Sequence, residues 1–296
     1  MKKILLYNDF PFHNEMFGFM LEYCKHRNYE AHVLFRYDHL NYFDFYKVFF
    51  KFFIVNEVKP ELYDMVVVLT DSDWSYEEKW INDKTICIDH WYQLRNKLIK
   101  HHVPISPFRN IYYKENFIIP TYDTINISEY KKMVKKVTSI DIVILGRAHP
   151  DNYEELKFIK CGTQITFHIV NCHGVHESLK NKKDVKIYDN KISTLELYNL
   201  LLNSEYILIT DKNESHTKGY SMSASIALSL NTGCQLIMPE EMNKYLRLKS
   251  AIVYRKNEDL ELSILPEYKL VEQEKFYFIN IRNRILDNFF EKDFRV

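Results

Sequence analysis

Short apolar runs alternate with longer segments of helical spacing along most of this 296-residue chain. In the first half the strand-like runs are 4–7, 31–35, 65–69 and 85–88. Between the first two runs, four apolar residues recur at the spacing of one helix face: Met16, Phe19, Met20 and Tyr23. Strands that are apolar throughout and separated by helices predict a parallel sheet that helices cover on both faces.

The second half repeats this pattern more regularly. Its strand-like runs are 142–145, 165–170, 185–188, 206–209, 236–238 and 252–254. Helical segments fit between them at 153–159, 176–180, 194–202, 223–230 and 241–248. Ser193 precedes the third helical segment and Glu196 follows three residues later, which is the spacing of a capping box. The predicted fold class is therefore α/β, with two Rossmann-like parallel-sheet domains in tandem.

A polar, lysine-rich stretch at 125–138 marks the domain boundary. We expect an N-terminal domain at 1–130, a second domain at 138–268 and closing amphipathic helices at 269–296. The buried positions expected in the closing segment are Phe276, Ile279, Ile285, Leu286 and Phe289. Ligands of open parallel sheets bind beyond the carboxyl ends of the strands, so the loops of two facing domains are expected to line a shared cleft.

The charge balance argues against a nucleic-acid partner. Lysine and arginine total 40 and so do aspartate and glutamate, which leaves no broad positive field to hold a phosphate backbone. A local basic pocket is compatible with this balance.

The five cysteines predict a reducing, cytoplasmic location, because they are odd in number, widely spaced and free of any C-x-x-C motif. The N-terminus has too short an apolar core for a signal peptide, and no apolar run is long enough for a membrane span. The richest candidate, Tyr42–Val55, is interrupted by three charges and is typical of an amphipathic helix. Such a helix either packs on the core or makes a peripheral contact with a membrane surface.

No metal or cofactor is expected. The cluster from His168 to His176 includes Cys172 and His173, but its spacing matches no closed zinc motif, and His168 falls within a predicted strand. His173 lies just past that strand and is a candidate for lining the cleft. The pair His101-His102 is interpreted as a solvated loop.

The strand-end loops of the first half carry groups suited to acid–base chemistry. His13 and Glu15 follow the first strand, Asp73 follows the third, and Asp89-His90 follows the fourth. Histidine exchanges a proton most readily near neutral pH, and Asp89 is placed to hold the tautomer of its neighbour. The alternative is ordinary turn and capping chemistry, which favours aspartate and serine in any protein.

The strand-end loops of the second half carry groups suited to an anion. Gly146-Arg147 follows the first strand of this half, and Lys218-Gly219 opens the serine-rich start of the helix at 223–230. A helix start has unpaired N–H groups and a partial positive charge, so two cations beside it form a credible pyrophosphate site. The alternative is simple N-capping by serine.

The second half resembles the nucleotide-binding domain of GT-B glycosyltransferases. The matching segments are V-I-L-G-R at 143–147, the strand at 206–209, the helix at 221–230, N-T-G-C-Q-L-I-M-P at 231–239 and A-I-V-Y at 251–254. The resemblance implies a last helix that crosses back to the first domain. It also implies a sugar-nucleotide donor whose diphosphate is bound by Arg147, Lys218, Gly219, Ser221 and Ser223. The donor sugar or nucleotide would be contacted by Glu214, Tyr220, Ser225 and His173.

The resemblance implies a metal-independent transfer of sugar from a nucleotide-diphosphate donor to a glycan or glycoconjugate acceptor on the N-terminal domain. In an inverting reaction His13 is the preferred base, with Asp73 or His90 in reserve. Many retaining members carry an acidic residue within the diphosphate-binding helix, where this chain has Ser225 and Ser229. Three alternatives remain open: a nucleotide-sugar epimerase, a non-catalytic nucleotide-sugar-binding module, and a DNA-modifying glucosyltransferase that the zero net charge disfavours.

Overall fold

The computed structural model of the chain divides into two compact units, each built on one parallel sheet. Unit 1 comprises 1–123, 220–222 and 277–296, and unit 2 comprises 124–219 and 223–276. The residues that the structure describes are 1–8, 13–35, 38, 41–70, 81–90, 99–105, 117–125, 130–131, 139–145, 156–170, 183–188, 192–210, 218 and 222–291.

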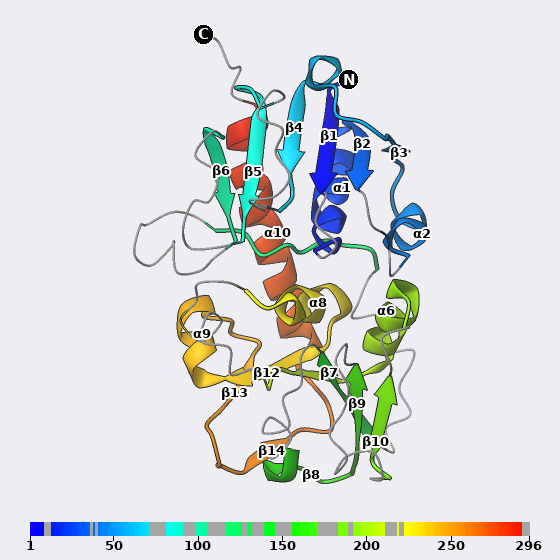
Figure 1. Cartoon of the computed structure of the whole chain (residues 1–296). Coiled ribbons are helices and arrows are strands. Elements are labelled where there is room, and N and C mark those ends of the chain that lie inside the picture. Colours follow the sequence, from blue (N-terminus) through cyan, green and yellow to red (C-terminus); the bar gives the residue numbers. More distant parts are fainter. Residues whose placement is uncertain are drawn as a thin grey trace. The chain divides into compact units, whose positions relative to one another are not determined.

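Sheet A of unit 1 has six parallel strands in the order β3-β2-β1-β4-β5-β6 (Figure 1). They are β1 (Lys3–Asn8), β2 (Glu30–Phe35), β3 (Phe53–Ile54), β4 (Met65–Val68), β5 (Thr85–Asp89) and β6 (His101–Pro104). Strands β1, β4 and β5 are almost fully buried, as expected for central strands of a sheet that is covered on both faces.

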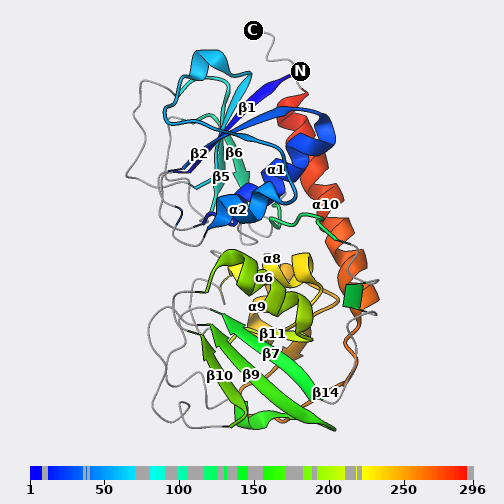
Figure 2. The same ribbon diagram turned by 90° about the vertical axis from the view of Figure 1, so that its right-hand side faces the viewer.

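The helices among the described residues of unit 1 are α1 (Met16–Arg27), α2 (Tyr42–Lys47) and the short 3₁₀ helix η1 (Pro60–Leu62). The second part of α10 (Tyr268–Phe290) also belongs to this unit and lies beside α1 (Figure 2). Tyr23 of α1 donates a hydrogen bond to Asp287 of α10 over 2.9 Å. The predicted apolar face of α1 is confirmed, since all four of its members are at most 1% exposed.

Sheet B of unit 2 has six parallel strands in the order β10-β9-β7-β11-β12-β13. They are β7 (Ser139–Leu145), β9 (Gln164–Val170), β10 (Val185–Tyr188), β11 (Tyr206–Leu208), β12 (Gln235–Pro239) and β13 (Ile252–Tyr254). A separate pair, β8 (Ile159–Cys161) and β14 (Leu260–Leu262), packs against the sheet face that carries Ile140, Ile142 and Ile144.

In the part of unit 2 that the structure describes, the helices are α6 (Thr194–Asn203), α8 (Ala224–Thr232), α9 (Glu240–Leu246) and the first part of α10. Figure 2 shows α6 and α8 together on one side of sheet B, away from β14. The capping box predicted at α6 is confirmed, with Ser193 and Glu196 bonding each other's backbone N–H groups. At the end of α8, Gly233 takes a left-handed φ of 73°, which glycine adopts without a steric penalty.

Each predicted strand of both halves is present, and four further strands were not predicted. Strands β3, β8 and β14 are short and partly exposed, so no run of apolar residues announces them. The fourth is β6, so the interpretation of His101-His102 as a solvated loop is wrong. The predicted helix at 153–159 is also wrong at its end, since Ile159 begins β8.

The expected amphipathic helix over 42–55 is replaced by α2 at Tyr42–Lys47, a turn and strand β3. In the closing helix, Ile279, Ile285 and Leu286 are buried as predicted, but Phe276 is 43% exposed. The buried face instead includes Lys275 and Arg282, which hydropathy assigns to solvent. Within the described part of the chain, no helix combines the length and apolar character that crossing a bilayer requires.

Candidate functional site

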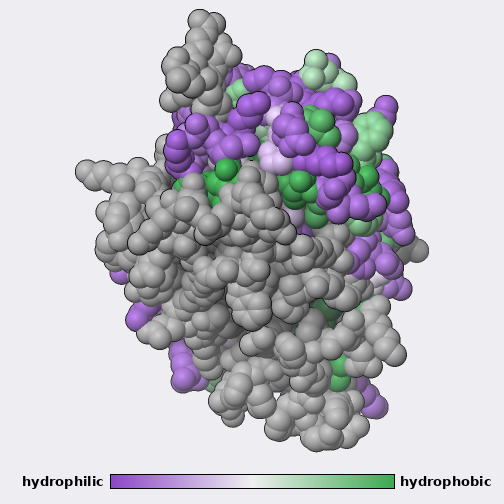
Figure 3. All heavy atoms as spheres, turned by 45° about the horizontal axis from the view of Figure 1, so that its top comes forward, coloured by the Kyte–Doolittle hydropathy of each residue, from purple (hydrophilic) through white to green (hydrophobic). Residues whose placement is uncertain are grey.

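Both sheets have a topological switch point, at the same place in their strand order. In sheet A the chain moves outward from β1 through β2 to β3, and then returns to the other side of β1 as β4. In sheet B, β7 and β11 stand in the same relation. Ligands of such sheets bind beyond the carboxyl ends of the strands where the order reverses. The ends of β1 and β4 therefore define a candidate site on unit 1, and the ends of β7 and β11 define one on unit 2. Figure 3 views the opposite end of unit 1, where hydrophilic side chains predominate among the described residues in sight.

At the switch point of sheet A, His13 makes close contacts with two titratable side chains. Its Nδ1 lies 3.0 Å from Oε1 of Glu15, and its ring centroid lies 4.5 Å from that of His90. The His13 side chain keeps 40% of its surface exposed, whereas His90 is only 8% exposed. The structure therefore brings together two of the predicted acid–base residues, with His13 as the more accessible one.

His13 holds an uncommon backbone conformation. Its φ of 67° lies in the left-handed region, where a side chain with a Cβ is strained by about 1–3 kcal/mol. The residues around it are tightly held, since Asn8 donates to the Asn14 side chain over 2.9 Å and the Tyr46 hydroxyl donates to the Asn14 carbonyl over 3.0 Å. These contacts hold residues 13–15 close to Asn8, the last residue of β1.

The tautomer of His13 follows from its partner. A carboxylate only accepts hydrogen bonds, so Nδ1 of His13 is the donor to Glu15, and a neutral ring then carries its lone pair on Nε2. Burial raises the pKa of Glu15, but the hydrogen bond and charge of His13 and the charge of His90 outweigh burial and leave this pKa below its ordinary value. Glu15 thus remains an ionised partner for the imidazole at neutral pH.

His90 is anchored differently from the expectation. Its Nε2 donates to the Leu69 carbonyl over 2.9 Å, at the end of β4. The neighbouring Asp89, predicted to hold the tautomer of His90, instead pairs with His102 of β6. Because residues adjacent in a strand point to opposite faces of the sheet, Asp89 and His90 are poorly placed to bond each other.

At the switch point of sheet B, α8 points its first turn at the carboxyl edge. Only Gly233 and Cys234 join the end of α8 to β12, so that end lies at the amino edge of the sheet. The nine residues of α8 span about 13 Å, which carries its start toward the opposite edge. Ser223 is the N-cap, and its side chain accepts from the backbone N–H of Ser225 over 3.4 Å. Ser225 is 5% exposed, and Lys218 is exposed.

Seven predicted site residues lie outside the described residues, and the structure says nothing of them. They are Asp73, Arg147, His173, Glu214, Gly219, Tyr220 and Ser221. The structure also shows a contact that the sequence did not predict, since Glu15 is the hydrogen-bond partner of the His13 imidazole. The sequence signal for this contact was the separation of two residues between His13 and Glu15, which on an irregular loop lets the two side chains meet.

No protein-family model matches the sequence, and no curated protein matches it either. Solved structures match it over nearly its whole length. The glycosyltransferase AviGT4, involved in avilamycin A biosynthesis, is similar with a TM-score of 0.61 at 11% identity, over 98% of this chain and 97% of its own. The chain has a GT-B fold.

Two further GT-B neighbours were solved with ligands. Alr3699/HepE of Anabaena, in complex with UDP and glucose, is similar with a TM-score of 0.52 at 11% identity, over 98% of this chain and 96% of its own. An alpha-glucosyltransferase in complex with UDP and a 13-mer DNA has the same TM-score at 10% identity, over 98% of this chain and 93% of its own. Likeness at this identity establishes the fold, and the chemistry has to be argued from the residues of this chain.

Proposed function

We propose that the chain is a glycosyltransferase that moves a sugar from a nucleotide-diphosphate donor to an acceptor hydroxyl. The observation that carries the proposal is the start of α8, which stands at the switch point of sheet B with Ser223 as its cap. A helix start at this position provides oriented N–H groups and a partial positive charge, which suit a diphosphate.

On the donor side, the diphosphate oxygens accept hydrogen bonds from the first turn of α8 and from the hydroxyl of Ser223. Lys218 and Arg147 supply positive charge, and Gly219 and Ser221 let the chain approach the phosphates. Glu214, Tyr220, Ser225 and His173 contact the sugar or nucleotide. These cations and dipoles stabilise the negative charge of the departing diphosphate, so the transfer needs no metal ion at that position.

On the acceptor side, His13 acts as the general base of an inverting reaction. Its Nε2 takes the proton of the acceptor hydroxyl while that oxygen bonds to the anomeric carbon of the donor. The bond from this carbon to the diphosphate oxygen breaks in the same step. Glu15 stabilises the resulting imidazolium, and His90 positions the ring that it contacts at 4.5 Å. Asp73 remains a reserve base.

The donor is proposed to be a UDP-sugar, because HepE and the alpha-glucosyltransferase were both solved with UDP. The acceptor is proposed to be a glycan or a glycoconjugate. A DNA acceptor, as in the alpha-glucosyltransferase complex, is disfavoured by the balance of 40 basic and 40 acidic residues.

The deciding experiment is a screen of sugar nucleotides that records melting temperature, hydrolysis and the sugar product. A donor at about 100 times its Kd stabilises the native state by about 2.7 kcal/mol and raises the melting temperature. A transferase then releases nucleoside diphosphate slowly to water and faster with acceptor. Release of an epimerised sugar identifies an epimerase, binding without turnover identifies a non-catalytic module, and binding of none of the donors overturns the proposal.

A further inference from the structure

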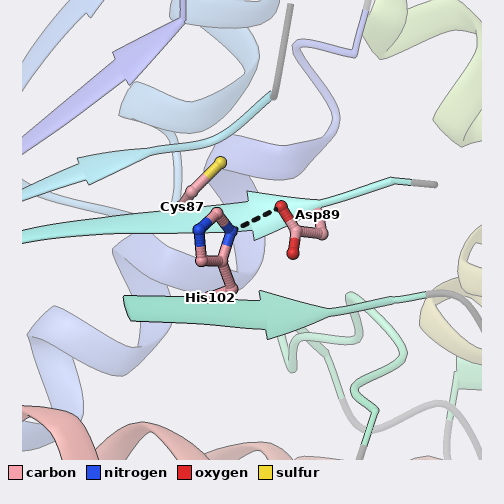
Figure 4. Close-up of side chains that lie close together, drawn as sticks. All are labelled: Cys87, Asp89 and His102. Carbon is pink, nitrogen blue, oxygen red and sulfur yellow. Dashed lines mark hydrogen bonds and ion pairs between the residues drawn. The ribbon is translucent and has the colours of Figure 1, made fainter. Parts of the chain in front are cut away.

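A second cluster of reactive side chains lies on sheet A, one strand from the switch point. Cys87 and Asp89 are two residues apart on β5 and therefore point to the same face. His102 stands opposite Cys87 in the β5–β6 register. The ligand atoms of all three lie within 4.8 Å of one another, and Figure 4 shows the His102 imidazole over β5 beside the other two side chains.

The hydrogen bonds of His102 fix which nitrogen faces the cluster. Its Nε2 lies 2.6 Å from the Ile99 carbonyl, which can only accept, so Nε2 carries a proton. Its Nδ1 points to Oδ1 of Asp89 at 2.9 Å. A histidine that binds a metal nearly always donates its other N–H to a carbonyl or carboxylate, and Ile99 fills that role here.

Because the cluster is buried, any ionised group in it needs a compensating charge. Cys87 and Asp89 are both 0% exposed, and the His102 side chain keeps 9% of its surface. An ionised group in such a place requires compensation. A divalent cation with one thiolate, one carboxylate and one neutral imidazole forms a complex without net charge, which meets this requirement.

We infer that Cys87, Asp89 and His102 bind a divalent transition-metal ion of the zinc class. Thiolate and imidazole ligands select such ions over Mg²⁺ or Ca²⁺, which prefer oxygen. Binding releases two protons to solvent, one from the Cys87 thiol and one from Nδ1 of His102. Three protein ligands leave a further coordination position for water or another group.

Metal binding requires the ligand atoms, which lie within 4.8 Å of one another, to move to the tetrahedral spacing. Tetrahedral ligand atoms about 2.1 Å from zinc stand about 3.4 Å apart. Oδ1 of Asp89 and Nδ1 of His102 are 2.9 Å apart, so they separate by about 0.5 Å when the metal enters, which a small rotation of the carboxylate provides. The metal fastens β6, the edge strand, to β5 and holds the end of β5 just before His90. Its role is therefore structural and separate from sugar transfer.

The competing account of the same contacts is an ion pair between Asp89 and a doubly protonated His102, with Cys87 as a buried thiol. That account needs no metal and predicts that replacing Cys87 by serine leaves the response to Zn²⁺ and Co²⁺ unchanged. The two accounts therefore differ in whether the chain binds a metal ion and in whether the Cys87 thiol takes part in binding it.

The test uses the full chain, purified without chelators and assayed for bound metal, then stripped and titrated with Zn²⁺ and Co²⁺. We expect about one zinc per chain, a rise in melting temperature with Zn²⁺, and a thiolate-to-cobalt absorption band with Co²⁺. Cys87→Ser abolishes the band, and His102→Gln weakens Zn²⁺ binding by more than the roughly 10- to 100-fold typical of outer-shell changes.

Cys161→Ser and His101→Gln are the matched controls and leave both signals unchanged. Absence of tight Zn²⁺ binding by the wild-type chain, or an undiminished cobalt band in Cys87→Ser, overturns the inference in favour of the metal-free ion pair. Neither readout involves sugar nucleotides, so these outcomes are independent of the proposed transferase activity.

Discussion

Arg282 of α10 and Glu22 of α1 form an ion pair that is almost completely removed from solvent. Nη1 of Arg282 lies 2.5 Å from Oε2 of Glu22, and the two side chains are 0% and 7% exposed. The same guanidinium group donates to the Thr121 carbonyl. The closing helix is therefore fixed to unit 1 by a charged contact inside the fold as well as by apolar packing.

Removing one member of this pair is expected to be far more harmful than removing both. Arg282→Met leaves the Glu22 carboxylate buried without its cation and lowers the free energy of unfolding by about 3–5 kcal/mol. Adding Glu22→Leu recovers a large part of that loss, because neither charge then remains buried. Urea unfolding of the two single variants and the double variant measures the coupling. The control is Arg27→Met, whose ion pair with Asp287 is partly exposed and contributes about 0–1 kcal/mol.

Gly18 permits a close approach that no other residue allows. A Cβ at this position would lie 2.5 Å from Cε1 of Tyr122, far inside contact distance. Gly18→Ala gains about 1 kcal/mol in helix propensity but forces α1 and Tyr122 apart, so a net loss of stability of about 1–2 kcal/mol is expected. Gly162→Ala is the control, because a Cβ there meets nothing within 4 Å. If thermal unfolding gives Gly18→Ala and Gly162→Ala the same melting temperature, this explanation is wrong.

The α/β class and the central strands could be predicted because each central strand is buried on both faces and is therefore apolar throughout. Strand β6 could not be predicted, because its sequence His101-His102-Val103-Pro104 begins with two polar residues. The partner of His102 is Asp89, which lies 13 residues away in the sequence. Likewise the buried face of α10 contains Lys275 and Arg282, and hydropathy cannot show that Arg282 meets Glu22.

The candidate site could be predicted only in part. The rule that ligands bind beyond strand ends selected the loops of His13 and His90 from sequence order alone. The pairing of His13 with Glu15, and of His90 with the Leu69 carbonyl, depends on a left-handed backbone at residue 13 and on the packing of neighbouring strands. Neither can be read from the spacing of residues along the chain.

The diphosphate proposal predicts that a single lysine controls donor affinity. Lys218→Ala removes one cation from the anion site and weakens binding of a nucleoside diphosphate about tenfold, the lower end of the range for charged hydrogen bonds because Lys218 is exposed. Isothermal titration with UDP and with uridine separates this effect from nucleoside recognition, since uridine affinity stays constant. Lys256→Ala removes an exposed lysine elsewhere in unit 2 and leaves both affinities unchanged. Equal UDP affinity in Lys218→Ala and wild type excludes this role.

The pH dependence of stability should report the ionised state of Glu15. Its pKa in the folded chain lies below the ordinary value of 4.5, so the ionised form stabilises the fold above that pH. The contribution falls away as the pH drops below 4.5 and through the folded pKa. Glu15→Gln removes this dependence, so the stability difference between wild type and variant shrinks as the pH falls below 4.5. A difference that grows as the pH falls contradicts the assigned direction.

Replacing His13 by asparagine separates its chemical role from its backbone role. Asparagine tolerates the left-handed conformation at φ 67° better than alanine does, so residue 13 keeps its backbone conformation. A general base contributes about 10²- to 10⁴-fold, and kcat is expected to fall by about that factor while the Kd of the donor stays unchanged. His26→Asn, at an exposed position near the end of α1, is the control and leaves kcat unaltered. A kcat for His13→Asn close to that of wild type would remove the base role from His13 and transfer the question to Asp73, whereas a large rise in donor Kd would place the imidazole against the donor.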